Sequence, residues 1–264
     1  SVVCVVSAVG GITDKLLLAG KQAQNKDNTF LETFNFITKS HFDIIKALNP
    51  ENNDTILSYA DDKLNELKSL LDGIYLINEL SPKTSDKLVG FGETMKNRAL
   101  SVERKNSQEL IITNSNFTKA EVDYSLTNKN IQEYFKSATQ SITIMPGFIS
   151  KSKLGEQTTL GRGGSDFTAA IIAAALNVDQ LEIWTDVSGM FTTNPKLVKQ
   201  AYPIDKISYQ EAMELSHFGA KVLYPPTVQP VLNLNIPIHI KNTMEPDAVG
   251  TIISNDETNG SKPV

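Results

Sequence analysis

Residues 158–168 read TTLGRGGSDFT and combine three glycines with one arginine. The glycines are Gly161, Gly163 and Gly164. They permit a tight loop, and we expect Ser165 to cap the helix that follows. Backbone N–H groups at a helix start point outward, and the helix dipole favours an anion there. Arg162 has no bulky neighbour to cover it, and its planar guanidinium suits a carboxylate or a phosphate.

Asp166 lies one residue beyond the expected cap and can face the same space, where its carboxylate would pair with a substrate ammonium. The alternative is a capped helix whose surface carries an ordinary Arg–Asp pair. A loop this rich in glycine loses backbone entropy without a structural gain, which favours a ligand site. Neither the spacing of a P-loop nor that of the dinucleotide-binding fingerprint is present.

Residues 183–195, IWTDVSGMFTTNP, describe a strand that ends in Thr185 and Asp186 and then turns through a Ser-Gly pair. Ligands of open α/β sheets bind beyond the carboxyl ends of strands, so Thr185 and Asp186 would suit a ribose or a base edge. Phe191 would pack on the base. A helix-capping aspartate in a βα loop explains Asp186 equally well.

Three other segments carry candidate residues. Residues 218–226, FGAKVLYPP, place Lys221 in an apolar turn, as a phosphate ligand or as a snorkelling surface lysine. Residues 90–95, GFGETM, put Glu93 in a helical stretch, where a half-buried carboxylate needs a partner such as an ammonium. A solvated Glu93 is the simpler alternative. Residues 7–13, SAVGGIT, end a strand and start a helix with a hydroxyl, which is another ligand edge.

Alternating strands and helices must position these residues. We expect strands at residues 2–8, 109–113, 141–145, 180–185, 236–240 and 251–253. We expect helices from residue 13, at 28–48, at 57–77, from 82 past Arg98, and at 128–139, 165–176, 208–218 and 227–235. Residues 151–157 read as a hairpin or a loop. This alternation predicts an α/β fold whose parallel or mixed sheet has helices on both faces.

Composition excludes several classes of protein. The chain has 264 residues, 40% of them hydrophobic, which suits one large α/β domain or two small ones. Its single cysteine excludes an internal disulfide framework and a cysteine-based zinc site, and its three histidines share no metal-binding spacing, so we expect no protein-held metal. No hydrolase motif occurs.

Charge and hydropathy also limit the partners. A net charge of −5 disfavours a nucleic-acid or polybasic membrane partner. No apolar run approaches the roughly 20 residues of a membrane span, and the first residues lack the basic start of a signal peptide, so we expect a cytoplasmic location. The chain opens at Ser1 directly into a strand, which leads us to expect missing material upstream.

The segments VVSAVGGITD, GFGE, TTLGRGGSDFTAA, WTDVSGMFTTNP, FGAKVLYP and IPIHIKNTMEPDAVGTIIS, in this order, resemble the aspartate kinases of the amino acid kinase family. Residues 79–93, ELSPKTSDKLVGFGE, look more like the bifunctional aspartate kinase–homoserine dehydrogenases. The resemblance implies a three-layer αβα sandwich around a mainly parallel sheet. It implies a catalytic domain at residues 1–254, with an aspartate lobe over about 1–178, an ATP lobe over about 179–254 and a linker at 255–264.

The resemblance also assigns site residues. Thr13, Glu93, Arg162 and Asp166 would line the aspartate pocket with the Gly163–Gly164–Ser165 loop, and Asp166 and Lys221 would act in catalysis. The nucleotide contacts would be Ser7, Thr185, Asp186, Phe191, Lys196, Lys221 and Val222. The family often has tyrosine at position 191 and arginine at position 196, so a hydroxyl and a guanidinium are replaced here.

The reaction implied is transfer of the γ-phosphoryl group of ATP, with Mg²⁺, to the β-carboxylate of L-aspartate. The product is 4-phospho-L-aspartate, the first step toward lysine, threonine, methionine and isoleucine. A carboxylate is already a nucleophile near neutral pH, so catalysis would rest on positioning and on neutralising phosphoryl charge. A homo-oligomer is implied for the intact protein.

One departure from the family concerns the first strand. Members of the family begin with a strand that carries a Lys-Phe-Gly-Gly-Thr-Ser motif, and this sequence does not contain that motif. It also contains no regulatory ACT domain and no dehydrogenase domain. We therefore expect a piece of the kinase domain with little or no activity alone and an exposed sheet edge. Two alternatives are open. One is another kinase of the family, acting on glutamate, acetylglutamate, carbamate or a nucleoside monophosphate. The other is a non-catalytic ligand-binding module.

Overall fold

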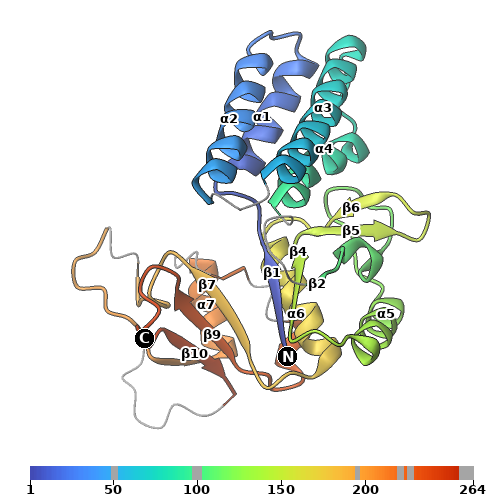
Figure 1. Cartoon of the computed structure of the whole chain (residues 1–264). Helices are drawn as coiled ribbons and strands as arrows, with labels where there is room; N and C mark the ends of the chain where they lie inside the picture. The colour runs from blue at the N-terminus through green and yellow to red at the C-terminus, as the bar shows by residue number, and fades with distance from the viewer. Residues whose placement is uncertain (49–52, 97–102, 194–196, 219–222, 225–228, 256–264) are drawn as a thin grey trace. The chain divides into compact units, whose positions relative to one another are not determined.

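The computed structural model describes residues 1–48, 53–96, 103–193, 197–218, 223–224 and 229–255. These residues form an α/β fold, as predicted, and five of the seven strand pairings among them are parallel (Figure 1). The chain divides into two units, each described by itself. The first unit is Ser1–Asn130 with Lys136–Gly161, and the second is Ile131–Phe135 with Arg162–Val264.

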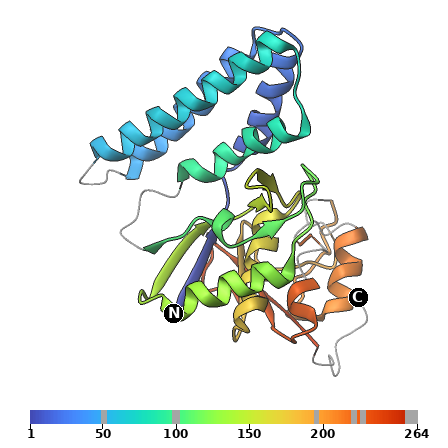
Figure 2. The same ribbon diagram turned by 90° about the vertical axis from the view of Figure 1, so that its right-hand side faces the viewer.

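Four helices of the first unit pack around a shared apolar core, and Figure 2 shows them alongside one another. They are α1 (Ile12–Gln24), α2 (Phe30–Leu48), α3 (Asn53–Ile77) and α4 (Pro82–Lys96). Leu64, Leu67 and Leu71 of α3 recur at helical spacing and are almost fully buried. Each such leucine stabilises the fold by roughly 1.5–3 kcal/mol. The four predicted helices are confirmed, while the stretch predicted beyond Lys96 lies outside the described residues.

Two small sheets complete the first unit. In one, β1 (Val2–Val6) runs parallel to β4 (Ile142–Pro146), and β2 (Glu103–Arg104) pairs with the other side of β4. In the other, β3 (Ile112–Thr113) lies beside β5 (Ile149–Ser152), which forms an antiparallel hairpin with β6 (Gln157–Thr159). This hairpin confirms one of the two readings of residues 151–157. Gly147 N donates to Val6 O at 2.9 Å, so β1 and β4 end at one edge.

Two predicted boundaries in this unit are wrong because side-chain caps move them. Of the strand predicted at residues 109–113, only residues 112 and 113 are extended, because a 3₁₀ turn, η1 (Ser107–Glu109), ends at residue 109 and residues 110 and 111 are irregular. Asn106 caps this turn by accepting from Gln108 N at 3.1 Å, and only β3 remains extended. The helix predicted at 128–139 begins earlier, as α5 (Tyr124–Ser137), because Asp123 accepts from Leu126 N at 3.1 Å.

The second unit is built on a four-stranded sheet with the order β7–β9–β10–β8. The strands are β7 (Leu181–Thr185), β8 (Lys206–Ser208), β9 (Ile238–Asn242) and β10 (Thr251–Ser254), and the helices are α6 (Gly164–Leu176), α7 (Tyr209–Phe218) and α8 (Gln229–Leu232). Inward-facing residues Ile183, Ile238 and Ile253 meet alanines of α6 in one core. Strand β8 was not predicted. The helix predicted at 227–235 is shorter, since Asn235 turns into the left-handed region with φ 55°. No helix among the described residues is long and apolar enough to cross a membrane.

Candidate active site

The glycine-rich loop leads from β6 into α6, and it begins that helix without help from a side chain. Gly163 is the N-cap, with φ 67° in the left-handed region that favours glycine. No side chain of the described residues caps this start, so the predicted Ser165 cap is wrong. Ser165 instead lies within the first turn, because α6 already begins at Gly164. The first N–H groups of α6 thus have no side-chain acceptor, as an anion site requires.

Gly163 also lets a second predicted motif reach this loop. A Cβ built on Gly163 would lie 2.7 Å from Cβ of Tyr224, so any larger residue would collide with that tyrosine. Tyr224 belongs to the FGAKVLYP motif, which the structure therefore brings against the glycine-rich loop. Lys221 and Val222 of the same motif lie outside the described residues. Arg162 is exposed, which leaves its guanidinium accessible to a ligand.

Asp166 lies in the first turn of α6 and is partly buried. Burial disfavours the charged carboxylate and raises the pKa of Asp166 from 3.8 to about 6. A cation placed beside the carboxylate would favour the charged form again and lower this pKa. Asp166 therefore has the properties expected of a group that receives a ligand ammonium.

In the first unit, Ser7 and Thr13 flank a helix start of the same kind. Ser7 follows β1 and is exposed, while Thr13 lies partly buried in the first turn of α1. The N-cap of α1 is Gly11, with φ 76°, and no described side chain caps it. The carboxyl end of β1 thus leads into a second uncapped helix start.

The two glycines of the GFGE motif allow α4 to approach this turn. A Cβ on Gly92 would lie only 3.2 Å from Cβ of Ala8, and one on Gly90 would collide with the side-chain amide of Gln157. Close packing here buries the next residue, Glu93, which is 3% exposed. The alternative of a solvated Glu93 is therefore wrong. The structure brings Ser7, Thr13 and Glu93 to neighbouring parts of the first unit.

Phe148 is a further candidate residue of the site, and no sequence pattern pointed to it. It follows β4 with φ 68°, a conformation that costs a bulky residue on the order of 1–3 kcal/mol. Its carbonyl accepts from Leu160 N at 2.9 Å, which ties it to the end of β6. Because β1 and β4 end at the same edge, Phe148 and Ser7 share that edge. The Pro146-Gly147 pair signalled a turn, but no local pattern revealed the backbone conformation of Phe148.

Thr185 and Asp186 lie at the carboxyl end of β7, as predicted. Thr185 is opposite Asn242 at the end of the parallel strand β9, and its carbonyl accepts from Thr243 N at 2.8 Å. The Thr185 hydroxyl donates to Asp186 Oδ1 at 3.2 Å. No helix follows directly, since residues 187–193 form bends and a bridge, so Asp186 is not a helix cap.

The loop after Asp186 is held by a close backbone approach. Gly189 has φ 108°, and a Cβ there would lie 2.5 Å from Thr251 Oγ1. Thr251 Oγ1 accepts from Met190 N at 2.7 Å, which fixes the loop on β10. Phe191 is partly buried and bridges to Pro203, while Lys196 lies outside the described residues. A hydroxyl, a carboxylate and an aromatic ring at strand ends fit a nucleoside.

The side chains of the described residues do not form a metal site of their own. No group of three histidine, cysteine, aspartate or glutamate residues lies close enough there to hold an ion. Mg²⁺ in kinases is commonly bound through substrate phosphates, water and one or two carboxylates. The residues present therefore fit an ion that arrives with a nucleotide.

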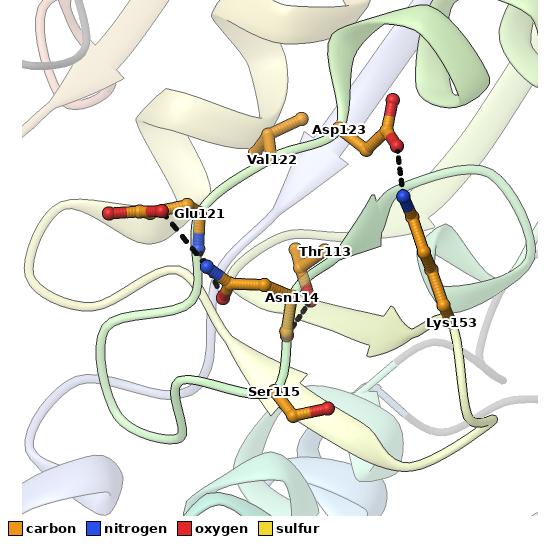
Figure 3. Close-up of a pocket in the computed structure, with 7 residues that line it drawn as sticks. All are labelled: Thr113, Asn114, Ser115, Glu121, Val122, Asp123 and Lys153. Atoms are coloured by element: carbon orange, nitrogen blue, oxygen red, sulfur yellow. Dashed lines mark hydrogen bonds and ion pairs between the residues drawn. The ribbon is translucent and has the colours of Figure 1, made fainter.

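A pocket of the first unit, shown in Figure 3, lies away from the predicted residues. It measures about 340 Å³ and is lined by Thr113, Asn114, Ser115, Glu121, Val122, Asp123 and Lys153. Its polar side chains bond to one another, with Asn114 Nδ2 donating to Glu121 Oε2 at 2.9 Å and Lys153 pairing with Asp123 at 2.7 Å. These contacts account for its polar groups without a ligand.

Glycine-rich turns, helix starts without side-chain caps and polar groups at strand ends are the features of an α/β fold that can accommodate anionic ligands. The chain belongs to the amino acid kinase family, whose family model matches residues 1–242. It is similar to Aspartokinase 1, chloroplastic, of Arabidopsis thaliana, with 35% identity over 96% of this chain and 47% of the relative. It is similar to Lysine-sensitive aspartokinase 3 of Escherichia coli, with 34% identity over 97% of this chain and 58% of the relative.

A solved structure agrees with these relatives. The crystal structure of E. coli aspartokinase III in complex with aspartate and ADP matches 97% of this chain and 58% of that chain, with a TM-score of 0.88 and 31% identity. The predicted amino acid kinase fold is therefore confirmed. The chain spans about half the length of these two aspartokinases. It spans 28% of Bifunctional aspartokinase/homoserine dehydrogenase 2, chloroplastic, of Arabidopsis thaliana, to which it is similar with 35% identity over 94% of this chain.

Proposed function

We propose that this chain is the catalytic domain of an aspartate kinase. An oxygen of the β-carboxylate of L-aspartate would attack the γ-phosphorus of ATP, and the bond from that phosphorus to the β–γ bridging oxygen would break. The products would be ADP and 4-phospho-L-aspartate. The observation that carries the proposal is the likeness to aspartokinase III, a structure solved with aspartate and ADP, at a TM-score of 0.88 over nearly the whole chain.

The residues of the aspartate side would bind and orient the substrate. Arg162 would hold the α-carboxylate through two hydrogen bonds, and Glu93 and Asp166 would meet the ammonium, with the Thr13 hydroxyl beside them. No general base is required, because a free aspartate side chain has a pKa of about 3.9 and is ionised at neutral pH. Catalysis would then rest on alignment and on the positive ends of α1 and α6.

The residues of the nucleotide side would hold ATP. Thr185 and Asp186 would contact the ribose and Phe191 the base, while Ser7, Lys196, Lys221 and Val222 would approach the phosphates. Lys221 would neutralise charge on the transferred group. Mg²⁺ bound to the phosphates would shield their charge. We assign residues of about 1–178 to the aspartate lobe, about 179–254 to the ATP lobe and 255–264 to a linker.

For the whole protein we propose a role in amino-acid biosynthesis, a homo-oligomer and a cytoplasmic location. We also propose a fusion to homoserine dehydrogenase. Residues 79–93 are the feature that supports the fusion.

A panel of matched ligands tests the proposed substrate by titration calorimetry. Succinate lacks the ammonium that Glu93 and Asp166 would meet, and β-alanine lacks the α-carboxylate that Arg162 would hold. We expect both to bind at least about 10-fold more weakly than L-aspartate. Tighter binding of L-glutamate or N-acetylglutamate would replace the proposal with another kinase of the family. Trapping the acyl phosphate with hydroxylamine then separates a kinase from a module that only binds.

A further inference from the structure

Asp86 is a buried carboxylate on α4 that anchors two distant segments of the first unit. It is 1% exposed. Its Oδ2 accepts from Thr118 N at 2.9 Å and from Thr159 N at 3.1 Å, and its Oδ1 accepts from the Thr159 hydroxyl at 2.7 Å. Its carbonyl accepts from Gln157 Nε2 at 2.8 Å. One turn of α4 is thereby bonded to β6 and to the loop that contains Thr118.

The anchored loop has an unfavourable backbone conformation. Thr118 is β-branched and has φ 72°, which such residues rarely adopt. Its N–H bonds to Asp86, while its carbonyl oxygen lies 3.4 Å from where a Cβ on Gly161 would stand. Ala120 N also donates to Thr159 O at 3.1 Å. The carboxylate therefore stabilises a turn that lies directly against the first glycine of the glycine-rich loop.

We propose that Asp86 is a positioning residue for substrate binding. By holding Thr118 and Thr159, it fixes the backbone of the first unit up to Gly161, the residue that precedes Arg162 in the sequence. Asp86 also lies seven residues before Glu93, two turns away on the same face of α4. Helix α4 thus carries Glu93, which is proposed to bind substrate, and Asp86, which holds the backbone before a second proposed substrate-binding residue. The link to substrate rests on the proposed function of Arg162 and Glu93.

A carboxylate suits this anchor, because an ionised carboxylate accepts several hydrogen bonds and donates none, and three donors point at Asp86. An asparagine could turn its oxygen toward the two N–H groups and its NH₂ group toward Thr159 Oγ1, since a hydroxyl also accepts. Asp86→Ala removes both acceptor oxygens and leaves the N–H groups of Thr118 and Thr159 without this partner.

The test compares Asp86→Ala and Thr159→Val with Thr159→Ser, which keeps the hydroxyl. Hydrogen exchange of the ligand-free chain measures how firmly the backbone around Thr159 is held. We expect the backbone amides of residues 158–163 to exchange at least about 10-fold faster in the first two variants. Thr159→Ser should exchange as the wild type does, and the exchange of residues 168–176 of α6 should be unchanged in all three variants.

Titration calorimetry then measures the effect of each variant on ligand affinity. We expect L-aspartate to bind at least about 10-fold more weakly in the first two variants, and Mg-ATP affinity to stay within about 2-fold.

The outcomes separate this proposal from the proposed function. Unchanged exchange in residues 158–163 overturns the anchor, and so does faster exchange with unchanged L-aspartate affinity. Parallel losses of L-aspartate and Mg-ATP binding would mean a general structural role and also overturn it. If the wild type binds no L-aspartate, the proposed function fails, while faster exchange in the variants still supports the anchor. If Asp86→Ala does not fold, the Thr159→Val and Thr159→Ser pair decides.

Discussion

Four helices of the described residues, α1, α5, α6 and α7, start in two different ways. α1 and α6 start at Gly11 and Gly163, both left-handed, and no side chain of the described residues caps them. α5 starts with Asp123, which accepts from Leu126 N. α7 starts with a capping box, in which Ser208 Oγ accepts from Glu211 N at 3.2 Å and Glu211 Oε2 accepts from Ser208 N at 2.9 Å.

This difference separates stabilising starts from starts that are open to a ligand. A serine, threonine, asparagine or aspartate cap stabilises a helix by about 0.5–2 kcal/mol relative to alanine but by only a few tenths relative to glycine. The glycine caps of α1 and α6 therefore forgo little stability. Both of these starts follow strands and contain residues that the sequence singled out for binding, and their backbone N–H groups have no side-chain cap to compete with an anion.

Gly163→Ala, at the start of α6, is expected to change the free energy of unfolding more than the other variants below. The new Cβ would collide with Tyr224 while holding a left-handed φ, so we expect the free energy of unfolding to fall by about 2–4 kcal/mol. L-aspartate binding should be lost with it. Gly155→Ala is the matched control, because Gly155 has φ 83° and a Cβ there meets no atom within 4 Å. We expect the control to cost about 1 kcal/mol by urea unfolding, from strain alone. Equal losses would contradict the collision.

The next largest effect on stability concerns the Asp166 carboxylate in the first turn of α6. The folded-state pKa of Asp166 is raised from 3.8 to about 6, so the folded state binds the proton more tightly than the unfolded state. Asp166 therefore reduces stability progressively as pH rises from about 4 to about 6. We expect Asp166→Asn to exceed the wild type by about 1–2 kcal/mol at pH 7, discounted for partial exposure, and to match it below pH 4. A pH-independent difference in urea unfolding would refute this.

The smallest effects test the caps themselves. Ser208→Ala breaks the capping box of α7, and we expect it to cost about 1 kcal/mol of unfolding free energy without changing L-aspartate affinity. Ser165→Ala changes a serine near the start of α6 that is not a cap, so we expect less than about 0.5 kcal/mol. If thermal unfolding showed equal losses, the two kinds of helix start would not differ as described.

Local patterns predicted much of this molecule. The glycine spacing at residues 161–164, the helical spacing in residues 28–77 and the strand that ends at Thr185 all depend on neighbouring residues, and the structure has these elements. The Ser165 cap was wrong because Gly163, in a left-handed conformation, already occupies the cap position. A rule that looks for serine at a helix start does not detect this.

Long-range contacts account for what the sequence could not reveal. Asp86 bonds to Thr118 and Thr159, which lie 32 and 73 residues away, and it gave no local signal. The conformation of Phe148 depends on how two separate strands end. The lobe boundaries and the ligand contacts of Ser7, Thr13, Glu93 and Arg162 stay predictions, because they concern ligands rather than the fold.

Titration calorimetry of L-aspartate with the wild type and with Arg162→Ala tests the central claim most directly. Arg104→Ala is the matched control, because it removes the same charge from an exposed arginine on β2. We expect the wild type to bind L-aspartate, Arg162→Ala to bind at least about 10-fold more weakly, and the control to stay within about 2-fold. Undiminished L-aspartate binding in folded Arg162→Ala, or none in the folded wild type, would contradict the account.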